Sequence, residues 1–270
     1  MRGQRLASAV VDRVRGLSAV EHVTVVDEQG LAWAGDGSED SPAYAAVGGA
    51  ALSSARASGL AVREVHIELS DARHIVVRPL PGTVPPLALV ATSVSRPVSS
   101  YLLDSTVAFA ALALGVEDAL RPHSDPLTGP GLRGTAADSS VARELERELA
   151  QARGPAGART LLITVEGNVL AGSSDEGPDL ARSLQITAAL RLLSASIERR
   201  LAVAPRRIDL TTACASTATL APLVKSGRFQ LFAIAPEGTI DTAIVDRLVG
   251  RIRRFMPAKP SSDALPMGAM

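Results

Sequence analysis

The first decisive stretch is residues 23–35, which read VTVVDEQGLAWAG. Residues 23–26 and 31–35 are short runs rich in strand-forming residues, and the break between them ends at Gly30. Two such runs around a turn that contains glycine predict a β-hairpin. The elements predicted on either side of this hairpin supply the rest of the fold.

Helices are predicted on both sides of the hairpin. The preceding segment has apolar residues at steps of three and four, which place them on one helix face: Leu6, Val10, Val14 and Leu17. After the hairpin, Ser41 offers a capping hydroxyl and Pro42 suits the first helical position. This second helix is expected to end at Gly59.

Three strands and a closing helix are expected next. The strands cover residues 63–69, 74–80 and 87–92, and the helix begins near Pro97. In the first of these strands, His66 and Glu68 alternate with Val65 and Ile67. This alternation predicts a strand with one apolar face and one solvent-exposed face.

The same order of elements recurs in the second half of the chain. A helix at 141–149, a hairpin at 161–172 and a helix from Pro178 precede strands at 207–212, 218–223 and 229–234 and a helix at 240–252. Gly30 and Gly35 match Gly167 and Gly172 at 137 positions, whereas Ile67 matches Ile208 at 141. Offsets that stay constant within elements and shift between them indicate an internal duplication.

We therefore expect an α+β fold made of two tandem units, each a five-stranded antiparallel sheet with flanking helices. The units are predicted at residues 1–121 and 139–256. Residues 122–138 are rich in proline and glycine and are interpreted as a linker, and residues 257–270 as a disordered tail.

Composition restricts the class of function. The chain has 28 basic and 28 acidic residues, a balance that argues against a nucleic-acid-binding protein. Its one cysteine, Cys214, allows no intramolecular disulfide, which fits a reducing cytoplasm. The first residues do not resemble a signal peptide. The longest apolar run, residues 107–116, is about half the length that spans a bilayer.

No catalytic or cofactor motif supports an enzyme. Residues 129–134 match Gly-x-Gly-x-x-Gly, but no strand precedes them, so we interpret them as linker rather than as a dinucleotide site. His66 and His74 could face each other on neighbouring strands as two metal ligands, yet no third ligand is evident and exposed strand positions explain both. We expect no catalytic residue, metal or cofactor.

Two further features allow more than one interpretation. A basic helix could contact a membrane surface or an acidic partner, or it could simply be a solvated face opposite Ile244 and Leu248; its residues are Arg247, Arg251, Arg253 and Arg254. Cys214 is interpreted as a small buried residue rather than as a reactive thiol.

These patterns resemble the roadblock family, which includes dynein roadblock light chains and bacterial gliding-motility regulators. The resemblance rests on the hairpin at 25–31, the Ala/Gly/Ser-rich second helix, and residues 63–68 leading to 75–80. It covers the first unit throughout and follows only the element order in the second. It implies a non-enzymatic scaffold or regulator that binds a protein partner, a small Ras-like GTPase.

The resemblance also implies dimerisation through the second helix and the adjacent edge strand. Applied to both units, it suggests an interface, within one chain or between chains, where small residues let helices approach closely. Its residues would be Ala46, Gly49, Ala50, Ser53, Glu64, His66, Glu68, Leu190, Leu193, Ile197, Arg207 and Asp209. The 122–138 linker would allow the two units to pair as an intramolecular pseudo-dimer.

A sensory module similar to a GAF domain is the alternative. Such a module should present a pocket with a few converging polar groups. The aromatic content of 3% argues against it, because ligand pockets are usually lined by aromatic side chains.

Overall fold

The computed structural model describes residues 2–17, 19–94, 98–114, 140–166, 168–174, 180–224, 228–235 and 238–255. The predicted linker, the predicted tail and the glycine motif at 129–134 lie outside the described residues.

Both halves of the chain contain helices and strands in the same order. The first half consists of α1 (Arg2–Arg15), β1 (His22–Asp27), β2 (Ala32–Gly35), α2 (Ser41–Ala57), β3 (Val62–Leu69), β4 (Arg73–Leu80), β5 (Leu87–Val94) and α3 (Ser100–Leu114). The second consists of α4 (Ser140–Arg153), β6 (Thr160–Val165), β7 (Asn168–Ser174), α5 (Leu180–Leu201), β8 (Pro205–Thr212), β9 (Thr217–Pro222), β10 (Phe229–Ala235), α6 (Thr242–Ile252) and a 3-10 turn η2 (Arg253–Phe255). The predicted α+β class is confirmed.

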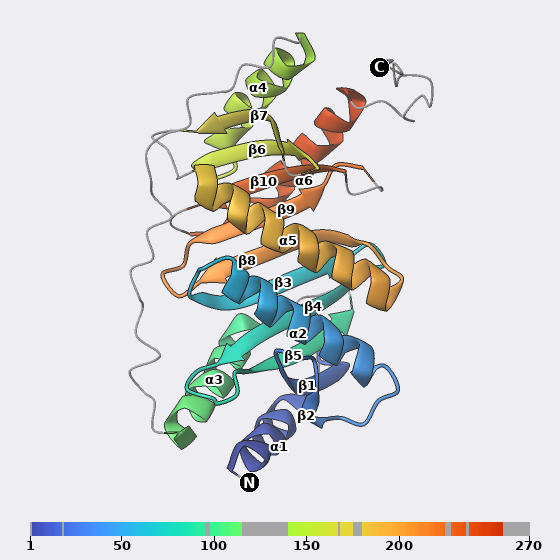
Figure 1. Cartoon of the computed structure of the whole chain (residues 1–270), viewed down its shortest axis with the longest axis vertical. Helices are drawn as coiled ribbons and strands as arrows, with labels where there is room; N and C mark the ends of the chain where they lie inside the picture. The colour runs from blue at the N-terminus through green and yellow to red at the C-terminus, as the bar shows by residue number, and fades with distance from the viewer. Residues whose placement is uncertain are drawn as a thin grey trace, which may run out of the picture.

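The strands form one antiparallel sheet of ten strands (Figure 1). Their order is β2-β1-β5-β4-β3-β8-β9-β10-β6-β7. The two halves therefore contribute five strands each, in mirrored order, and meet where β3 pairs with β8.

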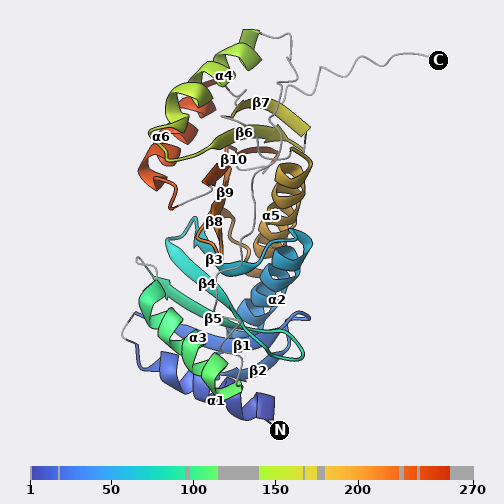
Figure 2. The same cartoon turned by 90° about the vertical axis from the view of Figure 1, so that its left-hand side faces the viewer.

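Helices cover both faces of this sheet. Helices α2 and α5 lie side by side on one face, and α1, α3, α4 and α6 lie on the other (Figure 2). Under α2 and α5 there is one apolar core to which both halves contribute. On the opposite face there are two separate cores, one beneath α1 and α3 and one beneath α4 and α6. The junction of the halves is thus continuous in the sheet and in one core.

Helix α2 packs closely against the sheet because it carries glycine at its contact face. A Cβ atom on Gly48 would lie 2.8 Å from Val26 Cγ2 and would also collide with Val90. The helix begins at Ser41, with Asp40 at the cap position and no capping bond from its side chain. The predicted capping role of Ser41 is therefore wrong, since this residue already lies inside the helix.

Among the described residues, no helix combines the length and the apolar character needed to cross a bilayer.

Candidate interaction site at the junction of the two halves

The junction is built on the antiparallel pairing of β3 with β8. Ile67 lies opposite Ile208, and on either side of this pair His66 lies opposite Asp209 and Glu68 opposite Arg207. Ile67 and Ile208 are the residues that the 141-position offset aligns, and they pair with each other. The same offset relates His66 to Arg207 and Glu68 to Asp209, so the central residues are arranged about an approximate two-fold axis.

One face of this strand pair is apolar. Val65 and Ile67 of β3 and Ile208 of β8 are buried in the shared core. The predicted interface residues of α5 pack in the same core and are all buried: Leu190, Leu193 and Ile197. The helices above are also linked directly, because Gln185 Nε2 donates a hydrogen bond to the Ala57 carbonyl at 2.7 Å.

The other face of the strand pair carries charges. Arg207 contacts Asp209 Oδ2 at 3.0 Å and Glu68 Oε2 at 3.0 Å, and Thr219 donates to Asp209 Oδ1 at 2.7 Å. His66 Nδ1 lies 3.7 Å from Asp209 Oδ2. Burial acts to raise the pKa of Asp209, but the contact with His66, the charge of Arg207 and the bond from Thr219 hold it below its ordinary value of 3.8.

Two histidines adjoin this charged group. His66 Nε2 lies 3.1 Å from His74 Nδ1, and their rings stack with centroids 5.3 Å apart. The expectation of exposed histidines is wrong, because the His66 side chain is 15% exposed and His74 is 9% exposed. Burial, and then the charge of His66, lower the pKa of His74. Within the described part of the chain, no group of three potential ligands could hold a metal ion.

Ion pairs connect the junction to the helices beside it. Arg206 of β8 contacts Glu68 at 3.1 Å and Asp246 of α6 at 2.6 Å. In the first half, Asp104 of α3 pairs with Arg63 at 2.5 Å and with the fully buried Arg78. Each half therefore ties its last helix to the sheet through one aspartate.

Glu64, another predicted interface residue, turns back to its own half. Its Oε2 atom lies 3.2 Å from Arg78 Nε, and its backbone is opposite Thr211 of β8. The Glu64 side chain thus pairs with an arginine of its own half rather than with a charged side chain of the other half.

The small residues of α2 have a different position from the one we expected. A Cβ atom on Gly49 would lie 2.7 Å from Gly30 Cα, and one on Gly30 would lie 2.9 Å from Ala46 Cα. Ser53 Oγ reaches the Glu28 carbonyl at 3.5 Å. Ala46, Gly49 and Ser53 therefore face the β1–β2 turn and allow it to approach α2.

The fourth small residue, Ala50, is half-buried and packs against the shared core. Ala50 therefore contacts the core that both halves share, whereas the contacts given for Ala46, Gly49 and Ser53 are with the β1–β2 turn.

Some residues of the junction were not predicted from the sequence, namely Arg78, Asp104, Arg206, Thr219 and Asp246. Asp104 and Asp246 are 142 positions apart, and this offset would have found them as a matched pair. Cys214 is half-buried in the β8–β9 turn, with its Sγ 3.0 Å from Thr212 Oγ1, so the expected full burial is wrong.

No protein-family model and no curated protein matches this chain. Three solved MglB structures are similar to it. The first is described as MglB with a tetrameric arrangement; it is 14% identical with a TM-score of 0.36, and the match covers 47% of this chain and 95% of that one. A gliding protein MglB from Thermus thermophilus is 17% identical, with a TM-score of 0.33 and coverage of 47% and 97%. Myxococcus xanthus MglB is 15% identical, with a TM-score of 0.30 and coverage of 46% and 93%.

Each match thus spans nearly all of an MglB chain and just under half of this one.

Proposed function

We propose that this protein is a non-enzymatic scaffold or regulator of a small Ras-like GTPase, working as a roadblock pseudo-dimer within one chain. The observation that carries the proposal is the β3–β8 junction, where equivalent strands pair about Ile67 and Ile208. The resemblance implies that roadblock domains dimerise through this strand and the second helix. Here α2 and α5 also lie together over one core.

The proposal includes the domain organisation. Residues 1–121 and 139–256 would be two copies of one unit, joined by residues 122–138 and followed by a tail at 257–270. The mirrored strand order and the shared offset of 141 positions support a duplication. A GTPase partner would place the protein in the cytoplasm.

The buried residues of the junction are not available to a partner, so the partner would bind an outer face. The best candidate is the exposed side of α5, where residues at helical spacing form a stripe: Gln185, Ala188, Leu192 and Ala195. Leu192 is 70% exposed, which is unusual for a large apolar side chain on a helix that also buries Leu190 and Leu193. We propose that this stripe contacts the GTPase.

The test is a titration of the purified chain with each purified small Ras-like GTPase of its source organism, loaded with GDP or with a non-hydrolysable GTP analogue. We expect one GTPase to bind in a nucleotide-dependent manner and its nucleotide exchange or hydrolysis rate to change. Replacing Leu192 by Glu should weaken binding by at least about tenfold, because it places a charge in an apolar contact.

Leu112→Glu is the matched control, since Leu112 is 60% exposed but lies on α3, across the sheet from α5. It should change the affinity by less than about twofold. The proposal fails if no GTPase binds in either nucleotide state. If the two variants weaken binding equally, the assignment of the α5 stripe fails.

A further inference from the structure

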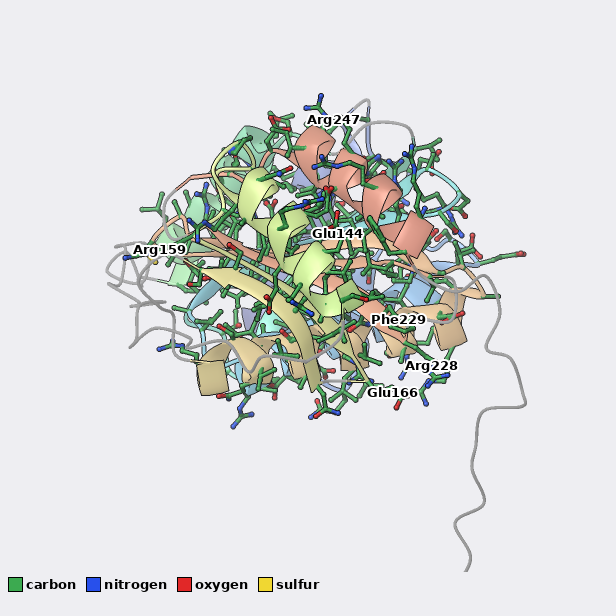
Figure 3. All side chains as sticks on the ribbon, turned by 90° about the horizontal axis from the view of Figure 1, so that it is seen from above. Glu144, Arg159, Glu166, Arg228, Phe229 and Arg247 are labelled. Carbon is green, nitrogen blue, oxygen red and sulfur yellow. The ribbon has the colours of Figure 1, made fainter. Side chains whose placement is uncertain are left out.

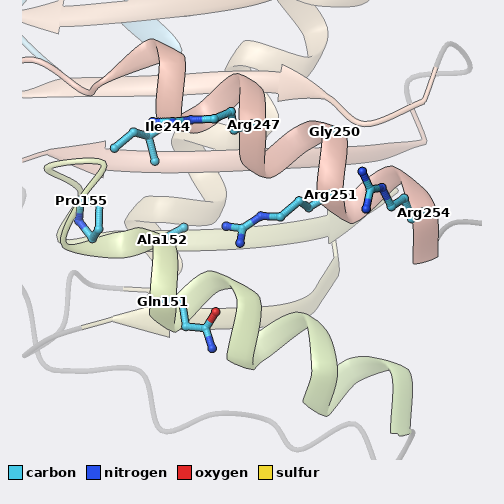
Figure 4. A pocket seen from close by; sticks show the side chains of 8 residues that line it. All are labelled: Gln151, Ala152, Pro155, Ile244, Arg247, Gly250, Arg251 and Arg254. Carbon is cyan, nitrogen blue, oxygen red and sulfur yellow. The ribbon is translucent and has the colours of Figure 1, made fainter.

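A pocket of about 530 Å³ lies between α4 and α6, at one end of the molecule. Its lining comes from both helices, the loop after α4 and η2: Gln151, Ala152, Pro155, Ile244, Arg247, Gly250, Arg251 and Arg254. Figure 4 shows the Arg251 side chain extending from α6 toward the side of α4 that carries Ala152. Seen from this end, Arg247 lies at the outer edge of α6, and Glu144 lies on α4 (Figure 3).

The corresponding place in the first half lies between α1 and α3. An offset of 142 positions aligns α3 with α6: it matches the buried Leu103 and Ala110 with the buried Val245 and Ile252. It also aligns Asp104 with Asp246, the two aspartates that tie these helices to the sheet. The structural correspondence of the two helices therefore rests on burial and on ion pairing.

At the pocket, several of the aligned residues differ in charge. Arg247 and Arg251 of α6 and Arg254 of η2 stand where α3 has Ser105, Phe109 and Leu112. An offset of 138 likewise aligns α1 with α4, where Glu148 stands in place of the buried Val10 and Gln151 in place of Arg13. In the first half, Phe109 instead packs toward α1 beneath Arg13, whose guanidinium carbon lies 5.4 Å from the ring centroid.

The pocket has excess positive charge. Arg251 pairs with Glu148 at 3.2 Å. Arg253, beside the pocket, is held by hydrogen bonds to the Leu223 and Pro222 carbonyls. Among the described residues, Arg247 and Arg254 have no ion-pair partner, so two guanidinium groups remain to face a ligand.

We infer that the α4–α6 pocket binds a phosphorylated small molecule or headgroup. Guanidinium groups present forked donors that match phosphate oxygens. Arg247 and Arg254 both line the pocket, one on either side of Arg251 (Figure 4). Ala152, Pro155 and Ile244 supply an apolar wall for the rest of the ligand. The volume lies within the usual range for small-molecule sites. This site lies on the opposite face of the sheet from the α5 stripe and does not depend on a GTPase partner.

Two sources could supply this phosphate, a soluble metabolite or a lipid headgroup, and the experiment separates them. One arm titrates the full chain with inorganic pyrophosphate by calorimetry. The other sediments it with vesicles of phosphatidylcholine, with and without phosphatidylglycerol. We expect saturable binding in at least one arm.

The deciding variant is the double substitution Arg247→Ser with Arg254→Leu, which installs the residues found at the aligned positions of α3. Both arginines are exposed, so the fold should be retained. The matched control, Arg143→Ser with Arg199→Ser, removes two exposed arginines elsewhere. The pocket variant should weaken binding by at least about tenfold and the control by less than about twofold.

Pyrophosphate binding that depends on the pocket arginines would identify a soluble ligand, and vesicle binding alone would identify a headgroup. The inference is overturned if the wild-type chain binds neither probe. It is also overturned if the pocket variant and the control lose affinity equally, because binding would then follow net charge rather than this site.

Discussion

The neutral form of His74 is favoured in the folded protein by its position in the sheet. It is buried beside His66, which stacks on it, and the charge of Arg207 also disfavours its protonation. Glu68 acts in the opposite direction, less strongly than burial and His66 but more strongly than Arg207. Protonation of His74 would therefore place a second positive charge in a group that already contains Arg207.

This arrangement predicts that stability falls in mild acid. Because folding lowers the pKa of His74, the unfolded chain binds more protons as the pH falls through 6.5, and stability is lost in that range. Thermal unfolding should show a falling midpoint between about pH 7 and pH 5.5. His74→Gln should flatten this slope.

The lowered pKa of Asp209 predicts a second loss of stability, at lower pH. Its lowered pKa means that its stabilising contribution is present above 3.8 and disappears as the pH falls below that value. An Asp209→Asn variant, measured alongside, should keep the slope near pH 6.5. A His74→Gln variant with the full wild-type slope near pH 6.5 would contradict the assignment to His74.

The sequence alone did not predict the charged group around His74 because its members come from separate segments. Alternation in residues 63–70 correctly identified the faces of β3, but not that the polar face is covered. Asp209 and Arg207 of β8 lie beside these histidines although they are more than 130 positions away in the sequence. A local pattern carries no information on that pairing.

At the scale of elements, glycines decide how closely α2 lies on the sheet. Gly48 contacts the Val26 and Val90 side chains, with no space for a Cβ atom. Gly250 of α6 is the opposite case, since a Cβ atom there would meet nothing within 4 Å. The two positions form a matched pair, because both are helical and only one is packed.

We expect Gly48→Ala to cost about 1–3 kcal/mol in the free energy of unfolding, because the added methyl group overpacks the contact with the sheet. Gly250→Ala should instead gain up to about 1 kcal/mol from helix propensity. Chemical denaturation of both variants measures the difference. Equal effects of the two substitutions would show that α2 can move away from the sheet at no cost.

The order of helices and strands was predictable, because most elements carry either helical or alternating periodicity. The exact first and last residues of the helices and strands were less predictable. Strand β8 begins at Pro205, two residues before the predicted strand, because it continues alongside β3. The role of Gly49 was also missed, since glycine spacing within a helix does not show whether a helix or the β1–β2 turn lies against it.

At the scale of the whole molecule, the junction uses a strand and a helix from each half, so the intact chain has no free β3 edge. We expect the full chain to be a monomer at low micromolar concentration. A fragment of residues 1–121 would expose β3 and leave the shared core without α5, and it should self-associate.

Light scattering of both samples tests this expectation. The fragment should elute as a dimer or larger, and adding residues 139–256 should convert it to a one-to-one complex. A dimeric full chain, or a fragment that remains monomeric and as stable as the full chain, would contradict the pairing of β3 with β8 within one polypeptide.

The junction also determines how far the two ends of the molecule can differ. A homodimer repeats each substitution at both ends, whereas β3 and β8 belong to one polypeptide whose ends change separately. Arg251 of α6 and Phe109 of α3 accordingly differ at aligned positions. The part of the chain that the structure describes consequently has a polarity along its long axis, with the arginine-lined α4–α6 pocket at one end. A partner that spans both ends can therefore bind in only one orientation.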